Sequence, residues 1–297
     1  MTINVRMIKE LREATGAGVL DTKKALETSG GDFKEAIRLL REKGMARAAK
    51  RSGRQTTEGR IEARIEGGRA GLLVEVNCET DFVGRNQEFA AFASGLADHF
   101  LSLADEEQTL DQVMARPFVS DSSTSPAELL QNQSSITGEN IAVRRFARFE
   151  LGDRPGVIEV YLHPGNRVGV MLELGSETAA GAAEESFTGT AHDLALHIAA
   201  CAPICLTREE ISRETLEAET GIYRTQALAS GKPEPIVERI VQGRLKKYFE
   251  DVVLFEQPFV KDDKVKVGEL LKQRAATLGE EITVRRFARY ELGESLD

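Results

Sequence analysis

A fourteen-residue segment from the middle of the chain is repeated at its C-terminal end. Residues 139–152 read ENIAVRRFARFELG, and residues 280–293 read EEITVRRFARYELG. A repeat of this length indicates that one structural unit occurs twice. Apolar and polar residues alternate in both copies, which is typical of a β-strand. We therefore expect a core of two similar units, whose repeated strands either run side by side or pack as pseudo-symmetric mates.

Each copy of the repeat follows a β-hairpin pattern. Residues 60–66 alternate between charged and apolar side chains, turn at Gly67-Gly68, and continue as the apolar run 71–77. The second hairpin comprises residues 157–162 and 169–174. Apolar helical patterns follow both hairpins, at 89–100 and around 192–200. The sequence predicts an α+β fold whose core has two subdomains, 53–152 and 153–206 with 251–297.

Residues 1–52 predict a small helical module. Its first helix is expected to stop at Gly16, and its second at Gly30-Gly31. The third begins at Asp32, which can cap it while Glu35 reaches back, and is expected to end at Gly44. The basic stretch 41–54 is interpreted as a solvated, partly helical linker rather than as an RNA contact.

Residues 207–250 interrupt the second unit with two charged helical patterns. These cover residues 207–219 and 235–250 and flank a turn at 229–233. We expect an antiparallel helical pair that projects from the core. Its seam is predicted to comprise five apolar side chains: Ile211, Leu216, Ile236, Ile240 and Leu245.

Composition favours protein partners over nucleic acid. The 48 acidic and 39 basic residues give a formal net charge of -9, which lacks the basic excess that drives non-specific binding to phosphates. No apolar stretch approaches the ~20 residues of a membrane span, and the N-terminus does not resemble a signal peptide. The three cysteines are too few for a disulfide framework, so we expect a reduced, cytoplasmic protein without a membrane partner.

No known catalytic or cofactor motif is present. Gly16-Ala17-Gly18 lacks the third glycine of a nucleotide-binding loop and follows a helical pattern rather than a strand, and the sequence contains no G-x-x-x-x-G-K-[ST]; it is therefore interpreted as a helix–helix turn. His197, Cys201 and Cys205 have helical spacing for metal ligands, but Pro203 interrupts them and no fourth ligand is nearby. We therefore predict a protein that is not an enzyme, with no catalytic residue, no bound metal and no cofactor.

The repeated arginines are expected to form structural ion pairs rather than a nucleic-acid platform. Strict alternation would place Val143, Arg145 and Phe149 on one face of the strand, and Arg144 and Arg148 on the other.

The two hairpin exits differ at one place. Residues 79–82 read Glu-Thr-Asp-Phe, whereas the corresponding residues 177–180 read Glu-Thr-Ala-Ala. The second copy indicates that the unit folds without an aromatic side chain here. Phe82 is therefore either a local core anchor or an exposed hot spot for a partner, and Asp81 is predicted to cap the following helix.

Four segments carry a resemblance to a known family. Residues 11–26, LREATGAGVLDTKKAL, and residues 75–83, EVNCETDFV, are similar to the two signatures of the elongation factor Ts family. Residues 230–233, SGKP, and 257–260, QPFV, also match its pattern. Members are guanine-nucleotide exchange factors of the translational GTPase EF-Tu. The resemblance covers essentially the whole chain.

This resemblance implies a ubiquitin-associated-like module at 1–52, a two-part core and an inserted coiled coil at 207–250. It also implies the contact residues. The module would dock on the GTPase domain through Arg12, Val19 and Leu20. Thr80-Asp81-Phe82-Val83 matches the segment that dislocates Mg²⁺ from the GTPase, and His197 would touch another domain of EF-Tu.

The resulting functional expectation is a translation elongation factor that binds EF-Tu in its GDP or nucleotide-free form and promotes exchange of GDP for GTP. A homodimer and a 2:2 complex both stay open. Two alternatives are kept. One is an RNA-binding ribosome accessory protein acting through Lys50, Arg51 and Arg54; the other is a hydrolase using Asp81 with His197.

Overall fold

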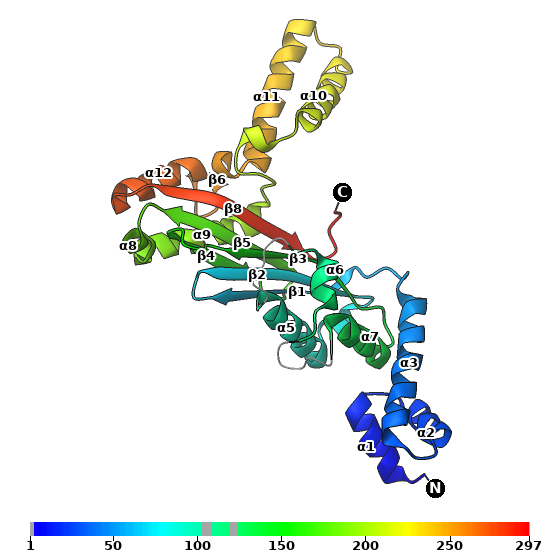
Figure 1. Ribbon diagram of the computed structural model, residues 1–297. Coiled ribbons are helices and arrows are strands. Elements are labelled where there is room, and N and C mark those ends of the chain that lie inside the picture. Colours follow the sequence, from blue (N-terminus) through cyan, green and yellow to red (C-terminus); the bar gives the residue numbers. More distant parts are fainter. Residues whose placement is uncertain (1–2, 103–107, 119–123, 297) are drawn as a thin grey trace.

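Two three-stranded antiparallel sheets with equivalent strand orders form the centre of the molecule (Figure 1). The computed structural model describes residues 3–102, 108–118 and 124–296. The first sheet contains β1 (Glu58–Glu66), β2 (Ala70–Cys78) and β3 (Ala142–Glu150); the second contains β4 (Gly156–Leu162), β5 (Val168–Ser176) and β8 (Ile282–Glu291). In each sheet the second hairpin strand is central. The repeated sequences form β3 and β8, which lie in different sheets.

The sheets pack against each other and are covered by helices on their outer faces. Ile61, Leu73, Ile158 and Met171 form part of the buried cluster between them. Helix α5 (Gln87–Leu101) packs on the first sheet, whereas α9 (Glu185–Cys201) and α12 (Val267–Leu278) contribute to the core on the outer face of the second. Both faces of β2 are thus covered, so all of its residues are buried. This explains why β2 is apolar without strict alternation.

A β-bulge in each repeated strand corrects the predicted strand faces. Glu75 pairs with Arg145 and Val76 with Val143, so Arg144 is the additional residue. The same shift occurs beside Arg285 in β8. Because a bulge reverses the alternation beyond it, Val143 packs toward the helices and Phe149 toward the other sheet. The prediction that Val143 and Phe149 share a face is therefore wrong.

The bulges allow two consecutive arginines to reach one buried glutamate. Arg144 Nη1 lies 3.4 Å and Arg145 Nε 2.8 Å from the carboxylate of Glu75, which is 0% exposed. In the second unit, Arg285 and Arg286 pair in the same way with Glu173, at 3.2 Å and 2.7 Å. Two cation–π contacts then cross between the sheets: Arg145 on Tyr290 and Arg286 on Phe149. The predicted structural role of these arginines is confirmed.

Three helices form a separate small core at the N-terminus. They are α1 (Val5–Thr15), α2 (Val19–Thr28) and α3 (Phe33–Arg51). Leu11, Leu26 and Ala36 are fully buried among them. Half of the predicted cap is present, because Asp32 Oδ1 accepts a hydrogen bond from the Glu35 backbone amide at 3.0 Å. The reciprocal bond from Glu35 is not formed: its carboxylate accepts from Arg38 Nε at 2.8 Å, and the Asp32 amide donates to the Ser29 carbonyl.

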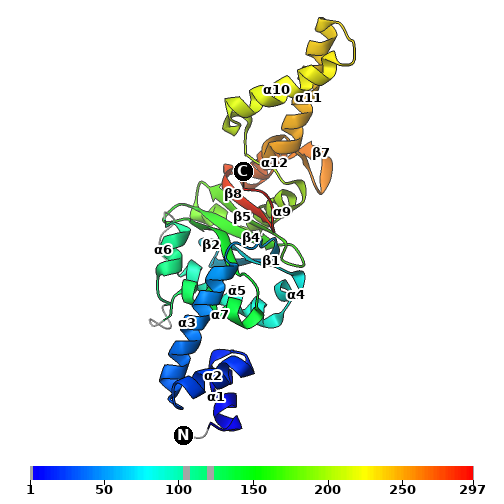
Figure 2. The ribbon, with the colours of Figure 1, turned by 90° about the vertical axis from the view of Figure 1, so that its right-hand side faces the viewer.

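Helix α3 continues through Gly44, so the predicted stop there is wrong. The glycine instead lets α7 (Pro126–Thr137) approach, since a Cβ at Gly44 would lie 2.8 Å from Ser135 Oγ. Further along α3, Arg51 donates to the Ser134 carbonyl at 2.9 Å. Most of the stretch interpreted as a linker is therefore helix that joins the N-terminal helices to the core (Figure 2).

The inserted segment forms two projecting helices, α10 (Arg213–Leu228) and α11 (Glu234–Val252) (Figure 1). The predicted seam is partly wrong: Ile211 precedes α10, and Ile236 is 44% exposed. The buried seam comprises Ala227, Val237, Val241 and Leu245, with Leu216 and Ile240 packed against it.

Several short elements complete the described chain. They are α4 (Asp81–Gly84), α6 (Leu110–Ala115), α8 (Ala179–Ala182), β6 (Pro258–Phe259), β7 (Asp262–Lys266) and the 3₁₀ turns η1 (Arg208–Glu210) and η2 (Leu254–Glu256). Helices α6, α7 and α12 lie outside the elements predicted from the sequence. Within the described ranges, none of the helices has the length and apolar character that crossing a bilayer requires.

Candidate functional site

The turn that joins β2 to α4 contains the predicted Thr80–Val83 segment. Thr80 is the N-cap: its Oγ1 accepts from the Val83 amide at 3.5 Å, and its carbonyl accepts from the Gly84 amide. The prediction that Asp81 caps this helix is wrong. Asp81 is instead the first helical residue, and its carboxylate lies 3.2 Å from the exposed guanidinium of Arg85.

Phe82 is exposed at the tip of this turn. Its exposed fraction is 84%, whereas Val83 packs against the core between the first sheet and α5. The structure therefore excludes the core-anchor interpretation of Phe82 and gives the anchoring role to Val83. Solvent contact leaves the apolar area of Phe82 available to a partner, as expected for an interface hot spot.

Glu139 holds the base of the turn. One carboxylate oxygen accepts from the backbone amides of Glu79 and Thr80, at 3.0 and 3.1 Å, and the other accepts from Thr80 Oγ1 at 2.6 Å. Glu139 is the first residue of the repeated segment. The repeat alone does not reveal its role, because the contact with Thr80 forms only in the folded protein.

The second unit holds an equivalent turn with the matching residue, Glu280. Its carboxylate accepts from Thr178 Oγ1 at 2.6 Å, from the Thr178 amide at 3.2 Å and from Ser176 Oγ at 2.8 Å. Bonds from Thr178 and Ser176 lower the pKa of Glu280. Here the exposed positions are Ala179 and Ala180. The two turns thus share their support and differ in the side chains that they present.

A second exposed apolar surface lies at the corner between α1 and α2. Val19 is 52% and Leu20 83% exposed, and Arg12 is exposed on the preceding helix. The buried Thr22 secures the corner by donating to the Gly18 carbonyl at 2.9 Å. Figure 2 shows this corner on the N-terminal helices, apart from α4 on the core. The predicted contact residues therefore form two separate surfaces.

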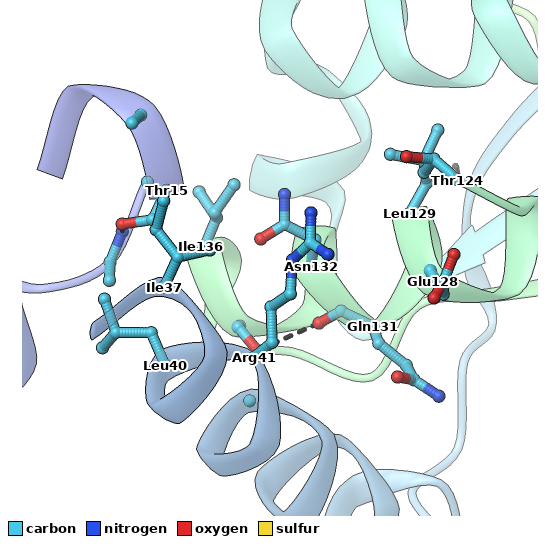
Figure 3. A pocket seen from close by; sticks show the side chains of 15 residues that line it. Thr15, Ile37, Leu40, Arg41, Thr124, Glu128, Leu129, Gln131, Asn132 and Ile136 are labelled. Atoms are coloured by element: carbon cyan, nitrogen blue, oxygen red, sulfur yellow. Dashed lines mark hydrogen bonds between the residues drawn. The ribbon is translucent and has the colours of Figure 1, made fainter. Parts of the chain in front are cut away.

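A cavity lies between the N-terminal helices and α7, beside their points of contact (Figure 3). Thr15, Ile37 and Leu40 face Asn132 and Ile136 across it. Its volume of about 200 Å³ is below the ~300–1,000 Å³ of typical ligand pockets. Mainly apolar, it is best described as a gap in helix packing.

His197 is buried, which corrects its expected role as a direct contact. Its exposed fraction is 0%, and Nδ1 accepts from the Val260 amide at 3.2 Å. Nε2 therefore carries the proton and donates to Gln257 Oε1 at 2.9 Å. The imidazole joins α9 to the segment 257–260. Next to these segments, Ile204 and Val260 are exposed, at 63% and 48%.

The described residues bring together neither the Asp81–His197 pair nor a set of metal ligands. Asp81 pairs with Arg85, whereas His197 contacts Gln257 and Val260, so the pair that a hydrolase would need is not formed. Burial raises the pKa of the Cys78 thiol to about 12, which disfavours a nucleophilic thiolate. In the part of the chain that the structure describes, no three His, Cys, Asp or Glu side chains converge as metal ligands.

Comparison with known proteins identifies the family. The model of the family described as elongation factor Ts matches residues 79–294. The chain belongs to the elongation factor Ts family. Relatives named elongation factor Ts include those of Trichlorobacter lovleyi, 41% identical, and Clostridium botulinum, 42% identical. A Nostoc relative with that name is 40% identical. The matches cover 100%, 99% and 99% of this chain, and 94% of each relative.

Both exposed surfaces lie within these elongation factor Ts matches. The family model begins at Glu79, beside the Phe82 turn. The N-terminal helices precede that model but fall within the near-complete alignments to the relatives.

Acidification is expected to destabilise the protein through its buried histidines. Burial lowers the pKa of both His99 and His197, so the unfolded chain binds more protons just below its histidine pKa of about 6.5. The free energy of unfolding is therefore fully retained above that pH. It falls as the pH drops toward the folded-state pKa values, by at most about 1.4 kcal/mol per pH unit for each histidine. Urea unfolding at pH 7.5 and 5.5 measures this loss.

His197→Gln should reduce that pH dependence, and adding His99→Gln should remove most of the remainder. Equal unfolding free energies of the wild type at both pH values would contradict the prediction.

Proposed function

We propose that this protein is a guanine-nucleotide exchange factor for the translational GTPase EF-Tu. It binds EF-Tu·GDP, displaces Mg²⁺, releases GDP and thereby permits exchange for GTP. The single observation that carries the proposal is Phe82, an 84% exposed aromatic on a turn held by Glu139, in a chain of this family. The chain itself needs no cofactor, because the nucleotide and the metal belong to the partner.

Phe82 acts as a wedge beside the nucleotide site. Burying one phenylalanine contributes roughly 1.5–3 kcal/mol, which is about one to two powers of ten in an equilibrium constant. Mg²⁺ is a large local charge that holds GDP, so its displacement weakens nucleotide binding further. One side chain is too little for the whole effect, so further contacts must also favour the nucleotide-free partner.

The N-terminal helices supply the second contact. Leu20 and Val19 provide exposed apolar area, and Arg12 adds a charge beside them. We assign these helices, residues 1–52, as the ubiquitin-associated-like module that docks on the GTPase domain. A third contact lies near Ile204 and Val260, on the surface above the buried His197.

The remaining architecture belongs to the same proposal. The core is a duplicated pair of α+β subdomains, 53–152 and 153–206 with 251–297, and residues 207–250 form an inserted coiled coil. The matching carboxylate-held turns and the matching Arg–Arg–Glu clusters support the duplication. We place the protein in the cytoplasm, where its partner works.

The basic stretch at the end of α3 does not favour an RNA-binding role. Arg51 donates to the Ser134 carbonyl, and Arg54 pairs with Glu79 at 3.2 Å. These two cations are engaged within the protein.

The direct test is release of fluorescent GDP from EF-Tu in a stopped-flow instrument. We expect saturating protein to accelerate release by more than the one to two powers of ten that a single buried phenylalanine contributes, because the other contacts add to it. Linkage requires that the two ligands weaken each other equally. The factor by which this protein lowers the affinity of EF-Tu for GDP must equal the factor by which GDP lowers the affinity of EF-Tu for this protein. Titration calorimetry measures both affinities. Unchanged release together with no detectable complex would overturn the proposal.

A further inference from the structure

The support of the Phe82 turn is a reciprocal clasp between two segments that are distant in the sequence. The carboxylate of Glu139 accepts from the Glu79 and Thr80 amides and from Thr80 Oγ1. In return, Glu79 Oε1 accepts from the Asn140 amide at 2.6 Å. Arg54 lies against the same Glu79 carboxylate at 3.2 Å. Hydrogen bonds to a carboxylate are stronger than neutral ones, so the clasp restricts the turn from both sides.

Helix α7 delivers Glu139 to this position. The helix ends at Thr137 and is capped by Gly138, whose φ of 77° lies in the left-handed region and turns the chain away from the helix. Ser134 Oγ then donates to the Glu139 carbonyl at 2.5 Å, and Thr137 Oγ1 accepts from the Glu139 amide at 3.3 Å. The backbone of Glu139 is therefore fixed to the last turn of α7, and its side chain points back to Thr80.

The same helix also receives the N-terminal helices. Ile136 lies so close to Gly16 that a Cβ there would be 2.7 Å from its side chain, and Ser135 approaches Gly44 in α3. Figure 3 shows Ile136 facing Thr15 and Ile37. Helix α7 thus connects the module that carries Leu20 with the turn that carries Phe82.

We propose that Glu139 is a positioning residue for Phe82 in nucleotide exchange. It holds the Thr80 turn in the orientation in which the exposed ring of Phe82 meets the GTPase. Because the turn is already ordered in the free protein, binding does not have to supply the entropy cost of ordering it. This inference rests on the proposed function. It goes beyond the exposed segment itself, because Glu139 lies about sixty positions away in the sequence and acts on Phe82 through its bonds to Glu79 and Thr80.

Glu139→Ala tests this role, because it removes all three bonds to the turn. We expect about tenfold slower stimulated GDP release, equivalent to ~1.4 kcal/mol. Glu280→Ala removes the matching clasp under Ala179 and Ala180, and is expected to leave release unchanged. Glu139→Gln keeps an acceptor for the two amides and should restore release to within about threefold of the wild type.

A double-mutant cycle with Phe82→Ala separates positioning from general damage to the fold. If Glu139 acts through Phe82, Glu139→Ala should cause no further loss in the Phe82→Ala background. Independent, multiplying losses would overturn the positioning role. So would normal release by Glu139→Ala while Phe82→Ala is slow, which would leave the proposed function intact. Normal release by Phe82→Ala would overturn the wedge and the positioning role together.

Discussion

Replacing Phe82 with alanine is expected to slow stimulated GDP release from EF-Tu by about 10- to 100-fold. The reason is the ~1.5–3 kcal/mol that burial of the ring contributes in the complex. Because Phe82 is 84% exposed in the free protein, its removal should change the free energy of unfolding by less than about 0.5 kcal/mol. Stopped-flow release of fluorescent GDP and urea unfolding measure the two quantities.

The second unit provides a matched design for this experiment. The double substitution Asp81→Ala with Phe82→Ala reproduces the sequence at Ala179 and Ala180, which an equivalent carboxylate-held turn already accommodates. This variant should fold as the wild type does and lose stimulation at least as strongly as Phe82→Ala. Leu228→Ala, which truncates another exposed apolar side chain on the projecting helices, serves as a control for loss of apolar surface. Wild-type release rates for a folded Phe82→Ala protein would contradict the wedge assignment.

Replacing Glu75 with alanine is expected to cost about 3–5 kcal/mol of stability, the usual penalty for removing one partner of a buried ion pair. The side chain is 0% exposed, and its loss would remove a carboxylate from Arg144 and Arg145, of which Arg145 keeps Glu294 at 2.6 Å. It also accepts hydrogen bonds from the Gly293 amide and from Asn77, both at 3.0 Å. Urea unfolding at pH 7 measures the change.

Two further variants make this result specific. Glu173→Ala removes the equivalent charge from the second sheet and should be similarly damaging. Glu217→Ala removes a carboxylate that is 64% exposed and pairs with Arg213, which is 90% exposed, so its cost should stay within about 1 kcal/mol. Equal, small effects of Glu75→Ala and Glu217→Ala would show that the buried cluster contributes little to stability.

Glu75 also contributes to acid sensitivity. Burial raises its pKa, but bonds from Gly293, Asn77 and Arg145 outweigh burial and lower it overall. Its stabilising contribution is therefore complete above the unfolded glutamate pKa of about 4.3 and is lost as the pH falls through the lower folded value. This window begins at a lower pH than that of His99 and His197, which begins near 6.5.

The sequence by itself determined the repeated strands, the hairpins that precede them and the Phe82 turn. It could do so because alternation, turn residues and a direct comparison of the two copies are local properties. Comparison of the two copies showed that alanines stand in the second turn where the first has Asp81 and Phe82. This difference distinguished the exposed side chains from the residues that form the turn itself. The four-segment resemblance indicated the family, and the full-length comparisons showed it.

Only the tertiary structure decided which side chains face solvent and which residues hold them. A bulge at Arg144 reversed the strand faces, because one additional residue shifts a two-residue period. Gly44 does not end α3. It lies where α3 packs closely against Ser135 of α7, and the contact leaves no room for a side chain there. Burial removed His197 from the surface and left Phe82 on it. The support of Thr80 by Glu139 joins positions about sixty residues apart, and such a contact depends on the folded path of the chain rather than on any local pattern.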